Sequence, residues 1–114
     1  MPARWISTAS PESAQSQMAI PSDPVYSYSN IASATTTVVK TGSGVLKKII
    51  VNKLVASGAI TIYDNTAASG TKIGTITSPA TLLVNQLTLD YGVRFLTGLT
   101  IVTSAADDVT VVYL

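Results

Sequence analysis

The chain has 114 residues, with seven basic and six acidic side chains and neither histidine nor cysteine. A formal net charge of +1 provides no electrostatic footprint for nucleic acid or an anionic membrane, so we expect neither partner. Without histidine and cysteine, the usual general base, the thiolate nucleophile and the two best zinc ligands are all missing. The composition therefore predicts that the chain is not an enzyme and uses no metal or other cofactor.

Charged residues make up 11% of the chain and hydrophobic residues 46%, whereas soluble domains are typically about 25% charged. A surface so poor in charge suits a subunit that stays packed against other subunits, and a small extracellular β-domain is the alternative. The length allows one small domain with a limited core, and self-association would add stability to it. We therefore expect a homo-oligomer.

Residues 1–34 are predicted to form an extended N-terminal arm. They are rich in Ser, Thr, Ala, Gln and Pro, and Pro11, Pro21 and Pro24 break any helix. The start lacks the apolar run of a secretory signal, and no later stretch approaches the length of a membrane span. Large apolar side chains along the arm are candidate anchors for grooves on neighbouring subunits: Trp5, Ile6, Met18, Ile20, Tyr26 and Tyr28. Alternatively, Tyr26 and Tyr28 flank the first strand and pack on the folded domain.

Residues 35–114 are predicted to form a single antiparallel β-sandwich, jelly-roll-like, with about eight short strands. β-Branched residues recur there in short runs separated by Gly, Asn, Asp or Pro. Eight strands at this spacing suit a jelly roll or a related sandwich. The expected strands are 35–40, 45–54, 59–63, 72–76, 81–89, 93–96, 99–103 and 108–114.

Alternation along these strands predicts which faces meet in the core. The sets that share a face are Ile60 with Ile62, Leu99 with Ile101, Val93 with Phe95, Val109 with Val111 and Tyr113, and Leu83 with Leu87, Leu89 and Tyr91. The strand 45–54 does not alternate cleanly, because Leu46 and Ile50 lie opposite Ile49 and Val51. Either a β-bulge in this strand or burial of both of its faces would explain the pattern.

The aspartates of the folded region are interpreted as turn formers. Asp64, Asp90, Asp107 and Asp108 each stand beside a turn signal, where a carboxylate accepts backbone N–H groups. The alternatives are a catalytic carboxylate pair or calcium ligands, but none of these residues has the spacing of a dedicated calcium loop.

Lys47, Lys48 and Lys53 form the basic cluster of the chain. Strand parity places Lys47 and Lys53 on one face and Lys48 on the other unless a bulge intervenes. We interpret these lysines as keeping a sheet face soluble or protecting an edge, with a subunit contact as the alternative.

Four stretches resemble small structural proteins of tailed bacteriophages: TGSGVL at 41–46, ITIYDNTAASGT at 60–71, GLTIVTS at 98–104 and DVTVVYL at 108–114. Within that class the resemblance implies a capsid cement or decoration protein, assembled in the host cytoplasm and located in the virion. Such proteins are β-sandwich modules, often trimeric, that tie neighbouring major capsid proteins together on the outer shell. The alternatives are another virion component of the tail, neck or head fibre, and a module that binds host-surface carbohydrate or protein. The resemblance carries no residue-level site.

Overall fold

The structure is a computed structural model, and it describes residues 25–114. Four of the candidate arm anchors, Trp5, Ile6, Met18 and Ile20, lie outside the described residues. Between residues 25 and 114 the chain forms eight β-strands and no helix, which confirms the all-β prediction.

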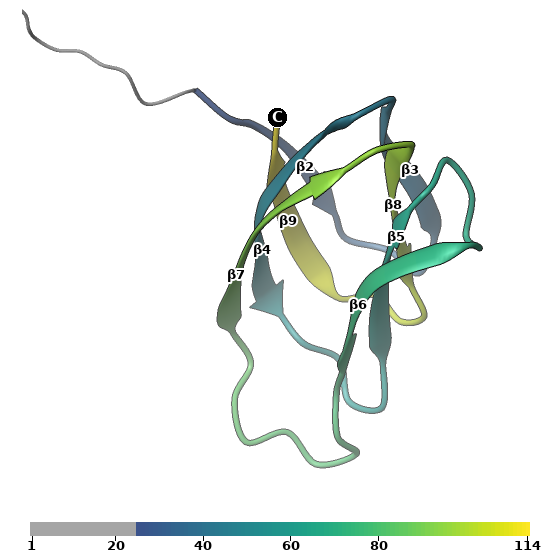
Figure 1. Ribbon diagram of the computed structural model, residues 1–114. Coiled ribbons are helices and arrows are strands. Elements are labelled where there is room, and N and C mark those ends of the chain that lie inside the picture. Colours follow the sequence, from purple (N-terminus) through teal and green to yellow (C-terminus); the bar gives the residue numbers. More distant parts are fainter. Residues whose placement is uncertain (1–24) are drawn as a thin grey trace, which may run out of the picture.

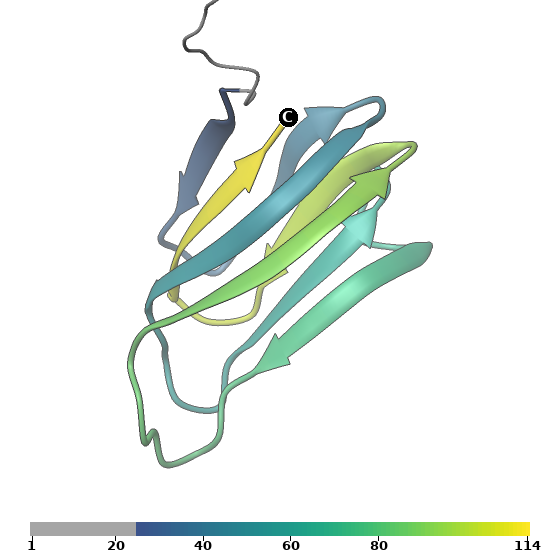
Figure 2. The same ribbon diagram turned by 60° about the vertical axis from the view of Figure 1, so that its left-hand side comes forward.

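The strands form two four-stranded antiparallel sheets that pack against each other. In chain order the strands are β2 (Ser27–Ile31), β3 (Thr36–Thr41), β4 (Gly44–Lys53), β5 (Ala59–Asp64), β6 (Thr71–Thr77), β7 (Leu87–Phe95), β8 (Gly98–Thr103) and β9 (Asp108–Tyr113). One sheet has the order β2-β9-β4-β7 and the other the order β3-β8-β5-β6. Figure 1 labels the strands, and Figure 2 shows one sheet in front of the other.

The chain runs up and down between the two ends of this double layer (Figure 1). The connections 42–43, 65–70 and 96–97 lie at the upper end with the C-terminus, and the connections 54–58, 78–86 and 104–107 lie at the lower end. Pairing is nested, because β2 pairs with β9, β3 with β8, β4 with β7 and β5 with β6. Two further pairings, β4 with β9 and β5 with β8, complete the sheets.

The core lies between the two layers and receives side chains from both. The buried apolar residues are Ile31, Leu46, Ile49, Val51, Leu54, Ile60, Ile62, Phe95, Leu99, Ile101, Val109 and Val111. Full burial of an aliphatic or aromatic side chain contributes about 1.5–3 kcal/mol, so this layer is the main source of stability. The predicted pairs Ile60 with Ile62, Leu99 with Ile101 and Val109 with Val111 are confirmed as core residues.

The first strand begins earlier in the chain than the sequence predicted. Residues 27–31, assigned to the arm, form β2 and pair with β9 from Ser27 opposite Tyr113 to Ile31 opposite Val109. Only Ile31 is buried in this strand. β2 was missed because its apolar signal is weak, and its hydrogen-bonding partner lies about eighty residues away in the sequence.

The predicted strands 81–89 and 93–96 are also corrected, because a single strand, β7, spans Leu87–Phe95. The Asp90-Tyr91-Gly92 segment suggested that the strand ends there. The side chains of Leu87, Tyr91 and Val93 nevertheless all pack against the core, so the strand continues through this segment. Gly92 has a φ of 60°, which allows a local irregularity without ending the strand. Residues 81–86 belong to the lower connection instead, and Leu83, expected in the core, is 93% exposed.

A bulge resolves the irregular pattern of β4. Its register against both β7 and β9 shifts between Leu46 and Lys48. Leu46 and Ile49 both point into the core with no exposure, so the two lysines between them lie on the outer side. The bulge therefore brings Lys47 and Lys48 to the same face, where regular parity would have separated them.

At the lower end, hydrogen bonds tie the connections to one another. The Ser57 N–H donates to the Pro79 carbonyl at 3.1 Å. Asp107 is fully buried there, and its Oδ1 accepts the Val55 N–H at 2.5 Å. Asp107 thus supports a connection far from it in sequence, in keeping with its interpretation as a turn former.

Candidate interaction surfaces

The outer side of the β2-β9-β4-β7 sheet carries most of the charge. Residues opposite each other in an antiparallel pair share a face, so the register defines rows across the sheet. Two such rows, Tyr28–Val112–Lys48–Asp90 and Asn30–Thr110–Ile50–Thr88, make up what we call the charged face. The strands of this sheet hold six of the ten charged residues between 25 and 114: Lys47, Lys48, Lys53, Asp90, Arg94 and Asp108.

The two tyrosines proposed as arm anchors lie at the edge of the charged face but differ in exposure. The Lys47 Nζ atom is 5.8 Å from the centroid of the Tyr26 ring, a distance typical of a cation–π contact. Tyr28 leaves 73% of its surface exposed. Tyr26 therefore packs on the folded domain, whereas Tyr28 offers a large aromatic surface to solvent.

A polar network fixes the lower part of the charged face. The Asn30 and Asn52 side-chain amides both donate to Oδ1 of Asp108, at 2.7 and 3.2 Å. The Asn52 amide also donates to the Thr110 hydroxyl at 3.0 Å. The hydrogen bond from Asn30, and then that from Asn52, lowers the pKa of the Asp108 carboxyl below its ordinary value of 3.8. This network joins β2, β4 and β9, so the acid acts as a cross-strand connector.

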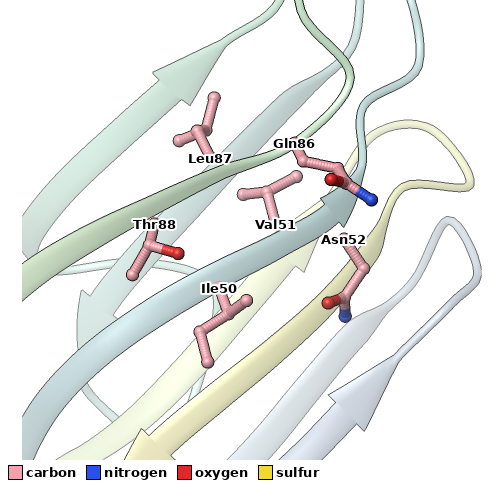
Figure 3. A pocket seen from close by; sticks show the side chains of 6 residues that line it. All are labelled: Ile50, Val51, Asn52, Gln86, Leu87 and Thr88. Carbon is pink, nitrogen blue, oxygen red and sulfur yellow. The ribbon is translucent and has the colours of Figure 1, made fainter.

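A shallow hollow of about 320 Å³ lies between the ends of β4 and β7 on this sheet. It presents amide, hydroxyl and aliphatic groups and no charged side chain (Figure 3). The residues that line it are Ile50, Val51, Asn52, Gln86, Leu87 and Thr88. Such a lining suits a neutral polar ligand or the side chains of an uncharged partner.

The outer side of the β3-β8-β5-β6 sheet has a different character. Its rows are Thr36–Val102–Thr61–Thr75 and Val38–Thr100–Tyr63–Lys72, and Lys72 at the edge is the one charged residue in them. Thr100 is buried, because the 65–70 connection covers it and the Asn65 carbonyl accepts its hydroxyl at 2.7 Å. We call the remaining uncharged set, Thr36, Val38, Thr61, Tyr63, Thr75 and Val102, the neutral face.

Asp64 organises the upper end. It is the last residue of β5, and its carboxylate accepts the N–H groups of Leu96, Thr97 and Gly98 at 2.8–3.4 Å. The Thr97 N–H, then the Leu96 and Gly98 N–H groups, lower the pKa of Asp64, while burial opposes them. The two-residue Leu96-Thr97 turn lacks a glycine, and this carboxylate from another strand satisfies the amides of the turn.

The lowered pKa of Asp64 predicts a pH-dependent stability. A depressed folded-state pKa means that the charged carboxylate stabilises the fold above the unfolded value of 3.8, and that this contribution is lost as the pH falls through the folded-state pKa. We expect Asp64→Asn to lower the thermal unfolding midpoint at pH 7. We also expect the gap from the wild type to narrow as the pH falls below 3.8.

Circular dichroism melts from neutral pH to about pH 2.5 measure this effect. The matched control is Asp90→Asn, because Asp90 lies on the exposed side of β7 within the charged face. Its midpoint should stay close to that of the wild type. An equal loss in the two variants would contradict the role given to Asp64.

The structure separates the four aspartates that the sequence grouped. Asp64 and Asp107 accept backbone amides of connecting segments, as a turn former does. Asp108 bonds to asparagine side chains across strands. Asp90 stands opposite Lys48 in the middle of β7, so its interpretation as a turn former is wrong. Local turn chemistry around Gly92 caused this error, because the same residues form a strand irregularity.

Comparison of the chain with models of known protein families, with curated proteins and with solved structures finds no match. Among residues 25–114, no three side chains of the His, Cys, Asp and Glu types gather as a metal site. The same part of the chain contains no helix with the length and apolarity needed to cross a membrane.

Proposed function

We propose that this chain is a structural protein of a phage particle, a capsid cement or decoration protein located in the virion. It binds the outer capsid surface and stabilises contacts between major capsid protein subunits. It acts without catalysis or a cofactor, and it self-associates, with the trimer as the state that the family resemblance favours. Support comes from the strand order, from the position of the resembling stretches and from the surface chemistry.

The strand order is the observation that carries the proposal. The eight strands pair in a nested way: the first pairs with the last, the second with the second last, and so on to the central hairpin of β5 and β6. Such pairing over two four-stranded sheets is the pattern of a jelly roll. We therefore propose a jelly-roll β-sandwich as the finer description of the fold. Jelly rolls are typical of viral capsid and lectin domains, so the topology favours the two function classes that the sequence left open.

The stretches that resemble phage proteins coincide with the centres of both sheets. They include β8 and β9 in full, most of β5 and the first residues of β4. These four strands occupy the inner positions of the orders β2-β9-β4-β7 and β3-β8-β5-β6. The resemblance therefore concerns the central strands of the fold. We propose that contacts with partners are made by the sheet edges, the outer faces and the arm.

We propose that residues 1–24 act as an arm that joins subunits. This part of the sequence carries Trp5, Ile6, Met18 and Ile20, and an arm of this kind could add a strand to an exposed sheet edge or fill grooves on a neighbour. Many copies on one shell make individually modest contacts act together. The exposed Tyr28 on β2 extends this anchoring surface onto the folded domain.

Binding to assembled shells tests the proposal. The probe is the empty shell of the major capsid protein from the phage that encodes the chain, and the readout is co-sedimentation of the chain with the shell. We expect the full chain to bind and a variant lacking residues 1–24 to bind at least about tenfold more weakly, because a lost anchor of about 1.4 kcal/mol has that effect.

The truncation point follows from the structure. A deletion through Asn30 would remove most of β2 and confuse unfolding with lost anchoring, whereas a deletion through residue 24 leaves every described strand intact. Equal far-UV circular dichroism and thermal midpoints in both proteins provide the control. Normal binding by the truncated chain would contradict the role of the arm, and failure of the full chain to bind would contradict the cement function.

A place elsewhere in the virion, in the tail, neck or head fibre, is the nearest alternative. It agrees equally well with the strand order, because jelly rolls serve many assembly roles. Electron microscopy of the assembled particle, with the chain labelled, separates these locations. Label on the shell surface supports the cement function, and label confined to the tail or neck contradicts it.

The hollow on the charged face favours a second candidate, a module for host-surface carbohydrate. The amides of Asn52 and Gln86 and the Thr88 hydroxyl are groups that bind sugar hydroxyls. No aromatic side chain lines this hollow to stack on a sugar ring. Binding on a glycan array that is lost in Asn52→Ala would support this candidate over the cement function.

A further inference from the structure

We propose that the neutral face is the surface through which copies of this chain associate with one another. This inference rests on the self-association in the proposed function and assigns it to one side of the molecule. The occupant of the neutral face is accordingly a second copy of the chain.

Charge is unevenly divided between the two outer sides of the double layer. The β2-β9-β4-β7 sheet holds lysines, an arginine and aspartates, whereas the other sheet holds Lys40, Asp64 and Lys72. All three lie toward the upper end: Lys40 places its Nζ 6.0 Å from the Phe95 ring centroid, Asp64 bonds to the 96–98 segment and Lys72 stands at the edge. Lys72 therefore borders the neutral face, in the same row as Val38 and Tyr63, while the six residues of the neutral face carry no charge.

A face without charge fits a copy of itself better than it fits a charged partner. A charged partner would lose hydration of its ionic groups on contact, and the neutral face has no opposite charge to compensate for that loss. The neutral face of a second copy brings no ionic groups into the contact. The contact between two neutral faces therefore avoids both like-charge repulsion and the burial of unmatched charge.

The hydroxyl groups of the neutral face are also complementary to themselves. Thr36, Thr61 and Thr75 stand in one row across the sheet, with Val102 between the first two. A threonine hydroxyl both donates and accepts, so two facing rows can satisfy each other. Val38, 47% exposed at the edge strand, and Val102 add apolar area to this contact.

Lysine substitutions in the full-length chain test this assignment. Thr61→Lys places a charge at the centre of the neutral face, and Thr75→Lys places one on its exposed edge strand β6. The matched control is Thr88→Lys, which changes an exposed threonine on the edge strand β7 of the opposite sheet. Size-exclusion chromatography with light scattering over a dilution series gives the mass, and circular dichroism melts show that each variant is folded.

We expect the wild type and Thr88→Lys to have a mass above that of one chain, and both neutral-face variants to dissociate with a dissociation constant raised about tenfold or more. Thr75→Lys keeps the test decisive if Thr61→Lys fails to fold, because Thr75 is exposed. Variants that associate like the wild type, equal dissociation of Thr88→Lys, or a wild type that stays a single chain would each overturn the assignment. Co-sedimentation with capsid shells is a separate readout. It therefore tests the proposed capsid attachment independently of the neutral face.

Discussion

Replacing Phe95 by alanine is expected to destabilise the fold by about 3–5 kcal/mol, the largest single effect we predict. Phe95 is the largest of the fully buried side chains and the last residue of β7. It closes the upper end of the core, opposite Gly44 in the β4 register and beneath the Lys40 ammonium. Small domains have total stabilities of about 5–15 kcal/mol, so this truncation should leave a substantial unfolded population.

Urea unfolding followed by circular dichroism measures this loss, with all proteins at one concentration because association adds apparent stability. Phe95→Leu is the control, since it keeps most of the apolar volume and should cost about 1.5 kcal/mol or less. A Phe95→Ala midpoint equal to that of the wild type would mean that Phe95 does not hold the upper end of the core.

Local patterning was sufficient where a strand alternates and lies in the middle of a sheet. The pattern assigned two pairs to the core, Ile60 with Ile62 and Val109 with Val111. β-Branched residues at every second position are typical of a strand with one buried face. The strand 45–54 was located correctly within a residue or so, but its bulge depends on the two partners β7 and β9. The local sequence therefore does not distinguish a bulge from burial on both faces.

Long-range pairing explains most of what could not be predicted. β2 has little apolar content and acquires its conformation from β9. Asp64 was recognisable as a turn former, yet the turn it supports begins more than thirty residues later. The composition shows that the chain has few charged residues. That most of them lie on one sheet follows from the nested strand order, which the composition does not reveal. A candidate surface of this kind has no local sequence signature.

The second large effect concerns Gly44, the first residue of β4. A Cβ atom there would overlap the Leu114 carbonyl oxygen and lie 2.6 Å from the Phe95 ring. The Leu114 carbonyl accepts the Val45 N–H at 3.1 Å, so relief of the clash must disturb either this hydrogen bond or the core. We expect Gly44→Ala to cost about 3 kcal/mol, the upper part of the range for overpacked sites.

Gly42, two residues earlier in the same turn, separates steric from conformational effects. Its φ is 91° and no atom lies within 4 Å of a Cβ built there, so Gly42→Ala meets only the backbone penalty of about 1–2 kcal/mol for a left-handed residue. Urea unfolding should therefore rank Gly44→Ala as the more damaging variant, and only that variant should lose hydrogen-exchange protection at the Val45 amide. Equal losses in the two variants would show that the approach of β4 to Leu114 and Phe95 is looser than the structure has it, because a close contact penalises a methyl group at residue 44 alone.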